Sequence, residues 1–311
     1  MAIDCGKLIR EIKDRKANKA LLQLPEGLKM QALEIAHALE KSGAEIILSV
    51  ETCYGACDIP DREAKSMGCD LIIHVGHSEM LGKTQVPVIY EEYRMAFDPV
   101  PLLEKNLKAL EPYKKICLMT TLQFLDSLEP AKRFLESRGK KVIIGKPKIA
   151  KYPGQILGCD YSAAKACEQA ADCFLFLGSG KFHPLGVSLG VDKHVLFLDY
   201  ESGKLENLEK ERFRLMRIRA AQIEKAKEAK SFGILVSTKQ GQGSLAVAES
   251  VKSQLEKKGK SAWILIAGEF TPEKLLGLKI DCLVDCACPR MAEDASMFKK
   301  PIIRPEDVEK L

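Results

Sequence analysis

The sequence lacks the long apolar run that would mark a membrane-spanning or exported chain. No stretch approaches the roughly 18 apolar residues that a membrane helix needs, and the N-terminal MAIDCGKLIREIKDRK carries charges throughout. An excess of one charge is missing too, because 48 basic and 43 acidic residues leave a net charge of only +5. Such a mild, dispersed excess does not favour nucleic-acid binding. We therefore expect a cytoplasmic protein that contacts neither membrane nor nucleic acid directly.

Closely spaced cysteine pairs of the CxxC type are also absent, although the chain has 11 cysteines. An odd number rules out complete pairing within the chain, and a reducing cytosol does not favour a disulfide framework. The 311 residues, 46% of them hydrophobic, are enough for two or three domains with buried cores. The cysteines are therefore expected to be buried thiols or metal ligands.

One strand–helix–strand order occurs three times along the chain. In each copy the first two apolar runs start about 25 to 30 residues apart, with a helical pattern between them, which is the spacing of a βαβ unit. This order predicts an α/β fold of three Rossmann-like βαβ units with small parallel sheets, in a pseudo-threefold arrangement. The units are residues 1–100, 101–204 and 205–311, and the last begins with a linker helix over about 205–230.

The linker helix is expected to have one apolar face. Phe213, Met216, Ala220 and Ile223 recur at the spacing of such a face. Several arginines lie nearby, and a solvated helix face is preferred for them over a docking surface for an acidic partner.

The expected strands divide the cysteines into two groups. Because cysteine is often buried, the first group is expected in the core, and it comprises Cys5, Cys69, Cys117, Cys167, Cys173 and Cys282. The second group lies just beyond strand ends, where open α/β sheets bind ligands, and it comprises Cys53, Cys57, Cys159, Cys286 and Cys288. Spacing alone leaves three interpretations of this group: a three-thiolate cluster with one open iron, a zinc site, or unligated buried thiols.

Four short motifs, spread over all three units, resemble the diphthamide synthase family. They are CYGACD at 53–58, HVGHSE at 74–79, GQILGC at 154–159 and ACPR at 287–290. The resemblance implies that Cys57, Cys159 and Cys288 ligate a [4Fe–4S] cluster. It also implies a homodimer of the archaeal type.

The family's reaction modifies one histidine of translation elongation factor 2. The resemblance implies an enzyme that cleaves S-adenosylmethionine (SAM) reductively between sulfur and the methionine γ-carbon. The 3-amino-3-carboxypropyl radical then adds to C2 of the target imidazole, which is the first step of diphthamide biosynthesis. Because the sequence contains no evident reductase module, an external electron donor is expected.

Candidate SAM contacts come from loops. The Ser237–Gly243 loop follows an expected strand, and its glycines permit close backbone approach; its candidates are Thr238, Gln240, Gly241 and Gln242. A plain strand-to-helix turn is the alternative. His77 and Arg290 are further candidates, against a histidine that caps backbone and a surface ion pair. Two other functions remain open, an iron–sulfur dehydratase and a non-catalytic metal- or nucleotide-binding scaffold.

Overall fold

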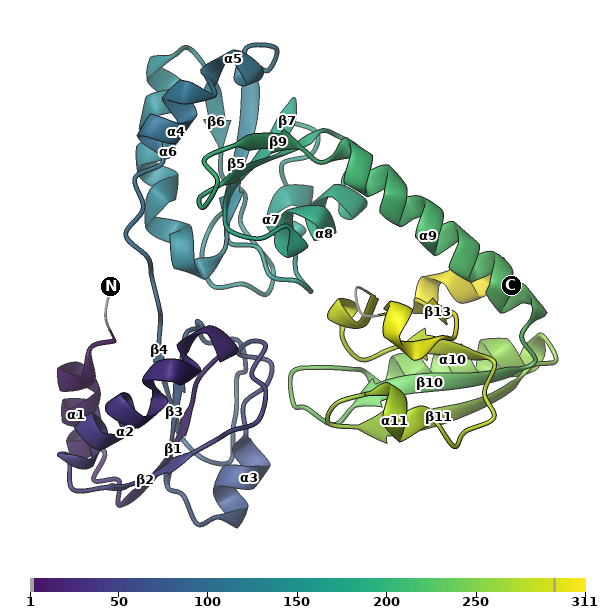
Figure 1. Ribbon diagram of the computed structural model, residues 1–311, viewed down its shortest axis with the longest axis horizontal. Helices are drawn as coiled ribbons and strands as arrows, with labels where there is room; N and C mark the ends of the chain where they lie inside the picture. Colours follow the sequence, from purple (N-terminus) through teal and green to yellow (C-terminus); the bar gives the residue numbers. More distant parts are fainter. Residues whose placement is uncertain (1–2, 293–294) are drawn as a thin grey trace. The chain divides into compact units, whose positions relative to one another are not determined.

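Three small sheets, one in each expected unit, organise the chain (Figure 1). The structure, a computed structural model, describes residues 3–292 and 295–311. The first sheet has the order β2-β1-β3-β4, from Glu45–Leu48, Lys19–Gln23, Leu71–Val75 and Val88–Glu91. The second has the order β6-β5-β7-β8-β9, from Lys141–Ile143, Lys115–Thr120, Cys173–Gly178, Val195–Asp199 and Leu205–Asn207. The third has the order β11-β10-β12-β13, from Ser261–Ala267, Ser231–Ser237, Cys282–Asp285 and Ile302–Ile303.

Twelve of these strands, four in each sheet, pair in parallel, as expected for βαβ units. The prediction of three small Rossmann-like sheets is therefore confirmed. The exception is β9, which pairs antiparallel with β8. The linker helix was expected to begin at about Leu205, where β9 lies. The predicted start is therefore wrong, because the helix begins at Glu209. Gly203, with φ +66, lies in the turn that brings Leu205 back beside β8.

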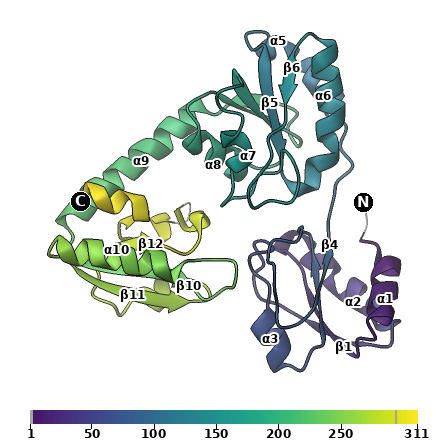
Figure 2. The ribbon, with the colours of Figure 1, turned by 180° about the vertical axis from the view of Figure 1, so that it is seen from behind.

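Helices connect the strands and cover both faces of each sheet (Figures 1 and 2). The α-helices are α1 Cys5–Asp14, α2 Ala32–Glu40, α3 Asp61–Ser66, α4 Val100–Lys105, α5 Leu107–Leu110, α6 Leu128–Ser137, α7 Ser162–Lys165, α8 Phe182–Gly190, α9 Glu209–Glu228, α10 Leu245–Lys257 and α11 Pro272–Leu275. Short 3-10 helices are η1 Glu26–Gln31, η2 Leu122–Ser127, η3 Pro289–Ala292, η4 Ala295–Phe298 and η5 Pro305–Lys310. None of the helices in the described residues is both long and apolar enough to cross a bilayer.

Alternating strand side chains explain the two-sided cores. In β5, Cys117 and Met119 pack in the cluster that includes residues of α7 and α8. Ile116 and Leu118 belong to the cluster on the other face, with residues of α4 and α6. Because successive strand side chains point to opposite faces, an uninterrupted apolar run is what a strand covered on both sides requires.

The predicted apolar face of α9 is only partly buried. Ile223 is 7% exposed and packs in the core of the third sheet, whereas Phe213 is 55% and Met216 46% exposed. The face is therefore buried near its C-terminal end and largely exposed before it. Within Lys210–Leu311, the C-terminal turns of α9 pack on the third sheet through Ile223 and Ala226.

By its contacts the chain divides into two compact units, Met1–Glu209 and Lys210–Leu311. The first contains two of the three sheets, and the second contains α9 and the third sheet. The division into residues 1–100, 101–204 and 205–311, and its pseudo-threefold arrangement, stay predictions.

Inside Met1–Glu209, a cluster of polar contacts centred on Glu92 connects the two sheets. The Glu92 carboxylate accepts hydrogen bonds from the Tyr152 hydroxyl at 2.8 Å and from Arg94 at 2.9 Å, and Lys151 lies 3.1 Å away. Arg94 also pairs with Asp126 at 2.7 Å. Although burial opposes it, this set of donors holds the pKa of Glu92 below its usual value. These contacts bind the segment around Tyr152, which precedes Cys159, to the segment around Glu92, which follows β4.

Candidate functional site

The first candidate thiol, Cys57, lies on the loop that follows β2. A tight turn closes this loop, with the Asp58 N–H donating to the Gly55 carbonyl at 3.0 Å. Cys57 is half-buried, whereas Cys53 is only 3% exposed. The CYGAC segment thus offers one partly accessible thiol and one enclosed thiol.

A chain of hydrogen bonds runs behind this loop from β1 to the end of β3. The Gln23 amide Nε2 donates to the Asp58 carbonyl at 2.7 Å, and its Oε1 lies 2.7 Å from Nδ1 of His74. His74 Nε2 in turn lies 3.0 Å from Nδ1 of His77. Gln23 and His74 are buried and His77 is half-buried. Burial lowers the pKa of His77 to about 4 and that of His74 well below its usual value, so both rings are neutral at physiological pH.

Cys53, His74 and His77 bring three ligand atoms within 4.8 Å of one another. Two imidazole nitrogens on one tetrahedral zinc ion would be about 3.3 Å apart, given zinc–nitrogen distances of about 2.0–2.1 Å. The observed 3.0 Å between the rings is instead the length of an N–H···N hydrogen bond. We therefore interpret the two histidines as a hydrogen-bonded pair, with the Cys53 thiol nearby.

The second candidate thiol, Cys159, lies on a loop before α7 and is exposed. Next to it, the buried Asp160 carboxylate accepts backbone N–H groups from Ile149, Ala150 and Ser162 at 2.9–3.0 Å. Although burial opposes it, hydrogen bonds from Ser162 and from these backbone groups lower the pKa of Asp160. An ionised carboxylate therefore fixes the loop that presents the Cys159 thiol.

Gly158 is another constraint on this loop. A Cβ built there would lie 2.6 Å from the ring of Phe182, the first residue of α8. Only glycine lets the chain pass so close to that ring. The Cys159 loop is thus seated directly against the start of α8.

A hydrogen bond between the two sheets of Met1–Glu209 connects the two thiol-bearing regions. Gln155 Nε2 donates to Ser78 Oγ at 3.2 Å, and both residues are buried. Ser78 follows His77, and Gln155 lies four residues before Cys159. The residue that follows His77 is therefore bonded to the segment leading to Cys159, while the His77 ring contacts His74.

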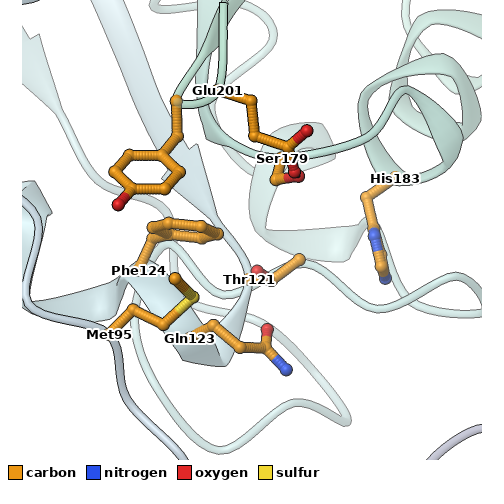
Figure 3. A pocket seen from close by; sticks show the side chains of 8 residues that line it. Met95, Thr121, Gln123, Phe124, Ser179, His183 and Glu201 are labelled. Atoms are coloured by element: carbon orange, nitrogen blue, oxygen red, sulfur yellow. The ribbon is translucent and has the colours of Figure 1, made fainter. Parts of the chain in front are cut away.

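A pocket of about 260 Å³ opens at the carboxyl edge of the second sheet (Figure 3). Its wall includes Thr121 after β5, Ser179 after β7, and Tyr200 and Glu201 after β8. Ser179 Oγ donates to Glu201 Oε1 at 2.5 Å. Phe124 and Tyr200 supply two aromatic rings, tilted against each other, whose centroids are 5.4 Å apart. The pocket therefore combines a carboxylate with aromatic rings at the sheet edge where α/β proteins bind ligands.

The third candidate thiol, Cys288, follows β12 in Lys210–Leu311 and is half-buried. Asp285, the last residue of β12, accepts the N–H groups of Ala287 at 2.9 Å and Cys288 at 3.2 Å on its Oδ1. Burial raises the pKa of Asp285 to about 6. The neighbouring Cys286 is 8% exposed, and burial raises the pKa of its thiol to about 12, so Cys286 is a poor source of thiolate.

The glycine-rich loop after β10 packs against the Cys286–Cys288 segment. A Cβ at Gly243, whose φ is +77, would lie 3.0 Å from Ser237 N and 3.2 Å from the Cys286 carbonyl oxygen. Thr238 and Gln240 are exposed, and Gly241 and Gln242 are half-buried. The next helix, α10, is capped by Ser244, which accepts the Val247 N–H at 3.3 Å. The Val247 N–H in the first turn of α10 is therefore already used by this cap.

The structure tests the expected burial of the core cysteines and shows where His77 and Arg290 lie. Cys69, Cys117, Cys167, Cys173 and Cys282 are buried as expected. Cys5 is only half-buried, because it lies at the start of α1 at the edge of the core, so its full burial was wrong. His77 contacts the His74 ring. Arg290 lies in η3, but its side chain is outside the described residues.

Sequence reasoning missed the polar residues that support the thiol loops. Gln23, His74 and Asp285 are buried polar residues within or at the end of apolar strands. That position was the available signal, since a polar residue in a buried strand needs a partner.

Comparisons with known proteins agree with the motifs. A model of diphthamide synthesis proteins matches residues 24–311. The chain is 40% identical over 307 residues to the 2-(3-amino-3-carboxypropyl)histidine synthase of Pyrococcus horikoshii, covering 98% of this chain and 88% of that protein. It is 31% identical to subunit 1 of the Homo sapiens synthase, covering 96% of this chain and 69% of that one.

Solved structures give the same result. Two crystal structures of Dph2 from Pyrococcus horikoshii, one of them described as with a 4Fe-4S cluster, match with a TM-score of 0.94 and 39% identity. Each match covers 99% of this chain and 90% of the solved chain. The resemblance seen in the sequence is thus confirmed, and the chain belongs to the diphthamide synthesis protein family.

Proposed function

We propose that this protein is an enzyme that transfers the 3-amino-3-carboxypropyl group of SAM to C2 of a histidine in translation elongation factor 2. This reaction is the first step of diphthamide biosynthesis. The observation that carries the proposal is 40% identity, across 98% of the chain, to the Pyrococcus horikoshii protein named for this histidine modification.

Three thiols, Cys57, Cys159 and Cys288, are proposed as the ligands of a [4Fe–4S] cluster. Their donor chemistry fits, because iron–sulfur clusters take thiolate ligands, and each lies on a loop and is at least partly exposed. The other cysteines beyond strand ends, Cys53 and Cys286, are buried. A bound cluster would supply the electron that breaks the bond between the sulfonium and the methionine γ-carbon.

The loop beside Cys288 is proposed to contact SAM through Thr238, Gln240, Gly241 and Gln242. The close packing of Gly243 on the Cys286 carbonyl supports this, since it sets the loop beside the proposed ligand. His77 and Arg290 are proposed as further contacts of SAM, Arg290 as a partner for its carboxylate.

The pocket of the second sheet is a candidate for the adenosine part of SAM. Carboxylates that follow strands of nucleotide-binding α/β sheets commonly accept hydrogen bonds from ribose hydroxyls. Glu201 holds such a position, and the rings of Phe124 and Tyr200 offer a surface on which a base can stack. His183 lines the same pocket, and it neighbours Phe182, on which the Cys159 loop is seated.

The proposal has consequences for partners. We propose elongation factor 2 as the protein substrate, an external protein as electron donor, and a homodimer as the working assembly. The reaction is proposed to take place in the cytoplasm, where that substrate is used.

Product analysis tests the proposal. The purified protein, kept anaerobic and brown with broad absorbance near ~400 nm, is given dithionite, SAM and elongation factor 2. We expect methylthioadenosine as the nucleoside product. 5′-Deoxyadenosine as the main product would refute the proposed bond cleavage. A fully loaded cluster without SAM turnover would favour the dehydratase or the scaffold.

A further inference from the structure

The hydrogen bonds behind the Cys57 loop determine which nitrogen of each histidine carries its proton. The Gln23 amide must direct its NH₂ to the Asp58 carbonyl, because a carbonyl oxygen only accepts. Its Oε1 then faces His74 Nδ1, which must be the protonated nitrogen of that neutral ring. His74 Nε2 is therefore an acceptor, and His77 Nδ1 must donate to it.

This sequence of donors leaves His77 with an unprotonated Nε2. We call this hydrogen-bonded chain, from His77 through His74 to Gln23, the relay. The relay cannot itself carry protons away, because it ends at a backbone carbonyl, which does not take up a proton. Its effect is to hold the His77 ring in one orientation and one tautomer. Burial lowers the pKa of His77 to about 4, so the lone pair of Nε2 is present at physiological pH.

The surroundings of His77 join the two thiol-bearing regions of Met1–Glu209. On one side its ring belongs to the group with Cys53, which shares its loop with Cys57. On the other side, Ser78 is hydrogen-bonded to Gln155, on the segment leading to Cys159. A basic nitrogen is thus built in beside both of the proposed cluster-binding loops.

We propose that Nε2 of His77 is the base that accepts the proton leaving C2 of the target histidine. This inference rests on the proposed function. When the aminocarboxypropyl radical adds to C2, a carbon–carbon bond forms and C2 keeps its hydrogen. Restoring the aromatic ring breaks that C2–H bond, so the proton goes to His77 Nε2 and one electron returns to the oxidised iron–sulfur cluster.

The proposal separates two steps, the cleavage of SAM and the later loss of the C2 proton. Only the second step needs a base. Methylthioadenosine forms before the proton leaves, whereas modified elongation factor 2 forms only after it. In His77→Gln, which keeps a polar side chain but has no basic nitrogen, we expect methylthioadenosine formation within about twofold of wild type. We expect the yield of modified factor to fall by about 100-fold, in line with the loss of a general base.

Matched measurements distinguish a base from a structural residue. His37→Gln changes an exposed histidine of α2 and should leave both products unchanged. His77→Ala should recover part of the modification when imidazole is added, because the small base can occupy the space left by the ring. A parallel loss of both products, a loss of bound iron in both His77 variants, or no loss of modification would each overturn the proposal. If even the wild type forms no methylthioadenosine, the proposed function fails instead.

A readout independent of turnover tests the tautomer. In the full-length protein labelled with ¹⁵N-histidine, we expect NMR to show His74 and His77 both protonated at Nδ1. A proton on His77 Nε2 would contradict the relay. Zinc bound in one-to-one ratio in addition to the cluster iron, lost in Cys53→Ser, would also overturn it, because the metal would occupy the lone pairs that the relay uses.

Discussion

The backbone N–H of Cys288 lies 3.2 Å from Oδ1 of the buried Asp285, which also accepts the N–H of Ala287. Asp160 plays the same part beside Cys159, where its carboxylate accepts three backbone N–H groups. Two of the three proposed ligands are thus presented by loops that a buried acidic side chain already holds. Because these loops are already held in place, less conformational entropy is lost when the thiols bind a ligand.

The cysteine variants test the proposed ligand set. Cys57→Ala, Cys159→Ala and Cys288→Ala should each lower the iron bound per chain and abolish most of the activity, because a thiolate ligand is removed. Cys53→Ala and Cys286→Ala should have milder effects, since these two thiols are buried. Iron content after anaerobic reconstitution is the measurement. The reverse ranking within either pair would show that the neighbouring cysteine is the ligand.

The ion pair between Arg219 and Asp307 stabilises the packing of α9 on η5. Two nitrogens of Arg219 each lie 2.9 Å from an oxygen of Asp307, which is fully buried. Arg219→Gln should reduce the free energy of unfolding by about 2 kcal/mol, because a buried carboxylate loses its main partner while Arg219 itself is partly exposed. Arg214→Gln, on the exposed part of the same helix, is the control and should change stability little.

The same pair predicts a pH dependence. Burial alone would raise the pKa of Asp307, but hydrogen bonds from Arg219 and Lys310 outweigh it and hold the pKa below its usual value. A carboxyl group with a lowered pKa in the folded state adds stability above its unfolded pKa of about 4 and loses it as the pH falls. The difference between wild type and Arg219→Gln in chemical denaturation should therefore shrink below about pH 4. A difference that grows in acid would contradict this assignment.

Gly243→Ala tests the glycine-rich loop. The added Cβ would meet Ser237 N and the Cys286 carbonyl oxygen in a backbone conformation that favours glycine. We expect a several-fold higher KM for SAM with unchanged iron content, because the loop must move away from the Cys288 segment. Gly277→Ala, where a Cβ meets nothing within 4 Å, is the matched control. If both variants changed the KM for SAM equally, the close approach of the Gly243 loop to the Cys286–Cys288 segment would not explain the effect.

Glu201→Gln tests the pocket of the second sheet. Loss of the charge should weaken binding of methylthioadenosine about tenfold, since a ribose hydroxyl bonds more strongly to a carboxylate than to an amide. Equilibrium dialysis with the wild type and with Glu129→Gln, on the exposed side of α6, provides the comparison. Unchanged binding in Glu201→Gln would exclude this pocket as the adenosine site.

Local patterns in the sequence were enough to predict the sheets. Strands such as Cys173–Gly178 are apolar on both faces. A strand that helices cover on both sides has such an uninterrupted apolar sequence. The edge strand β9 was missed because Leu205–Asn207 is short and carries no such run. For α9, helical periodicity predicts an apolar face but does not show how far a partner sheet covers it.

The candidate site was predictable only in part. Short motifs with glycine or proline identified the loops of Cys57, Cys159 and Cys288. The relay from Gln23 through His74 to His77 joins residues 51 and 3 positions apart. Only the parallel pairing of β1 with β3, which sets Gln23 opposite His74, brings the first two together.

Mass spectrometry of elongation factor 2 after turnover with SAM labelled by ¹³C in its methionine carbons tests the central claim most directly. The account predicts that one histidine gains a labelled 3-amino-3-carboxypropyl group on C2, in a reaction that needs both the cluster and a reductant. An unlabelled histidine after full conversion of SAM, or label on any other residue, would contradict it.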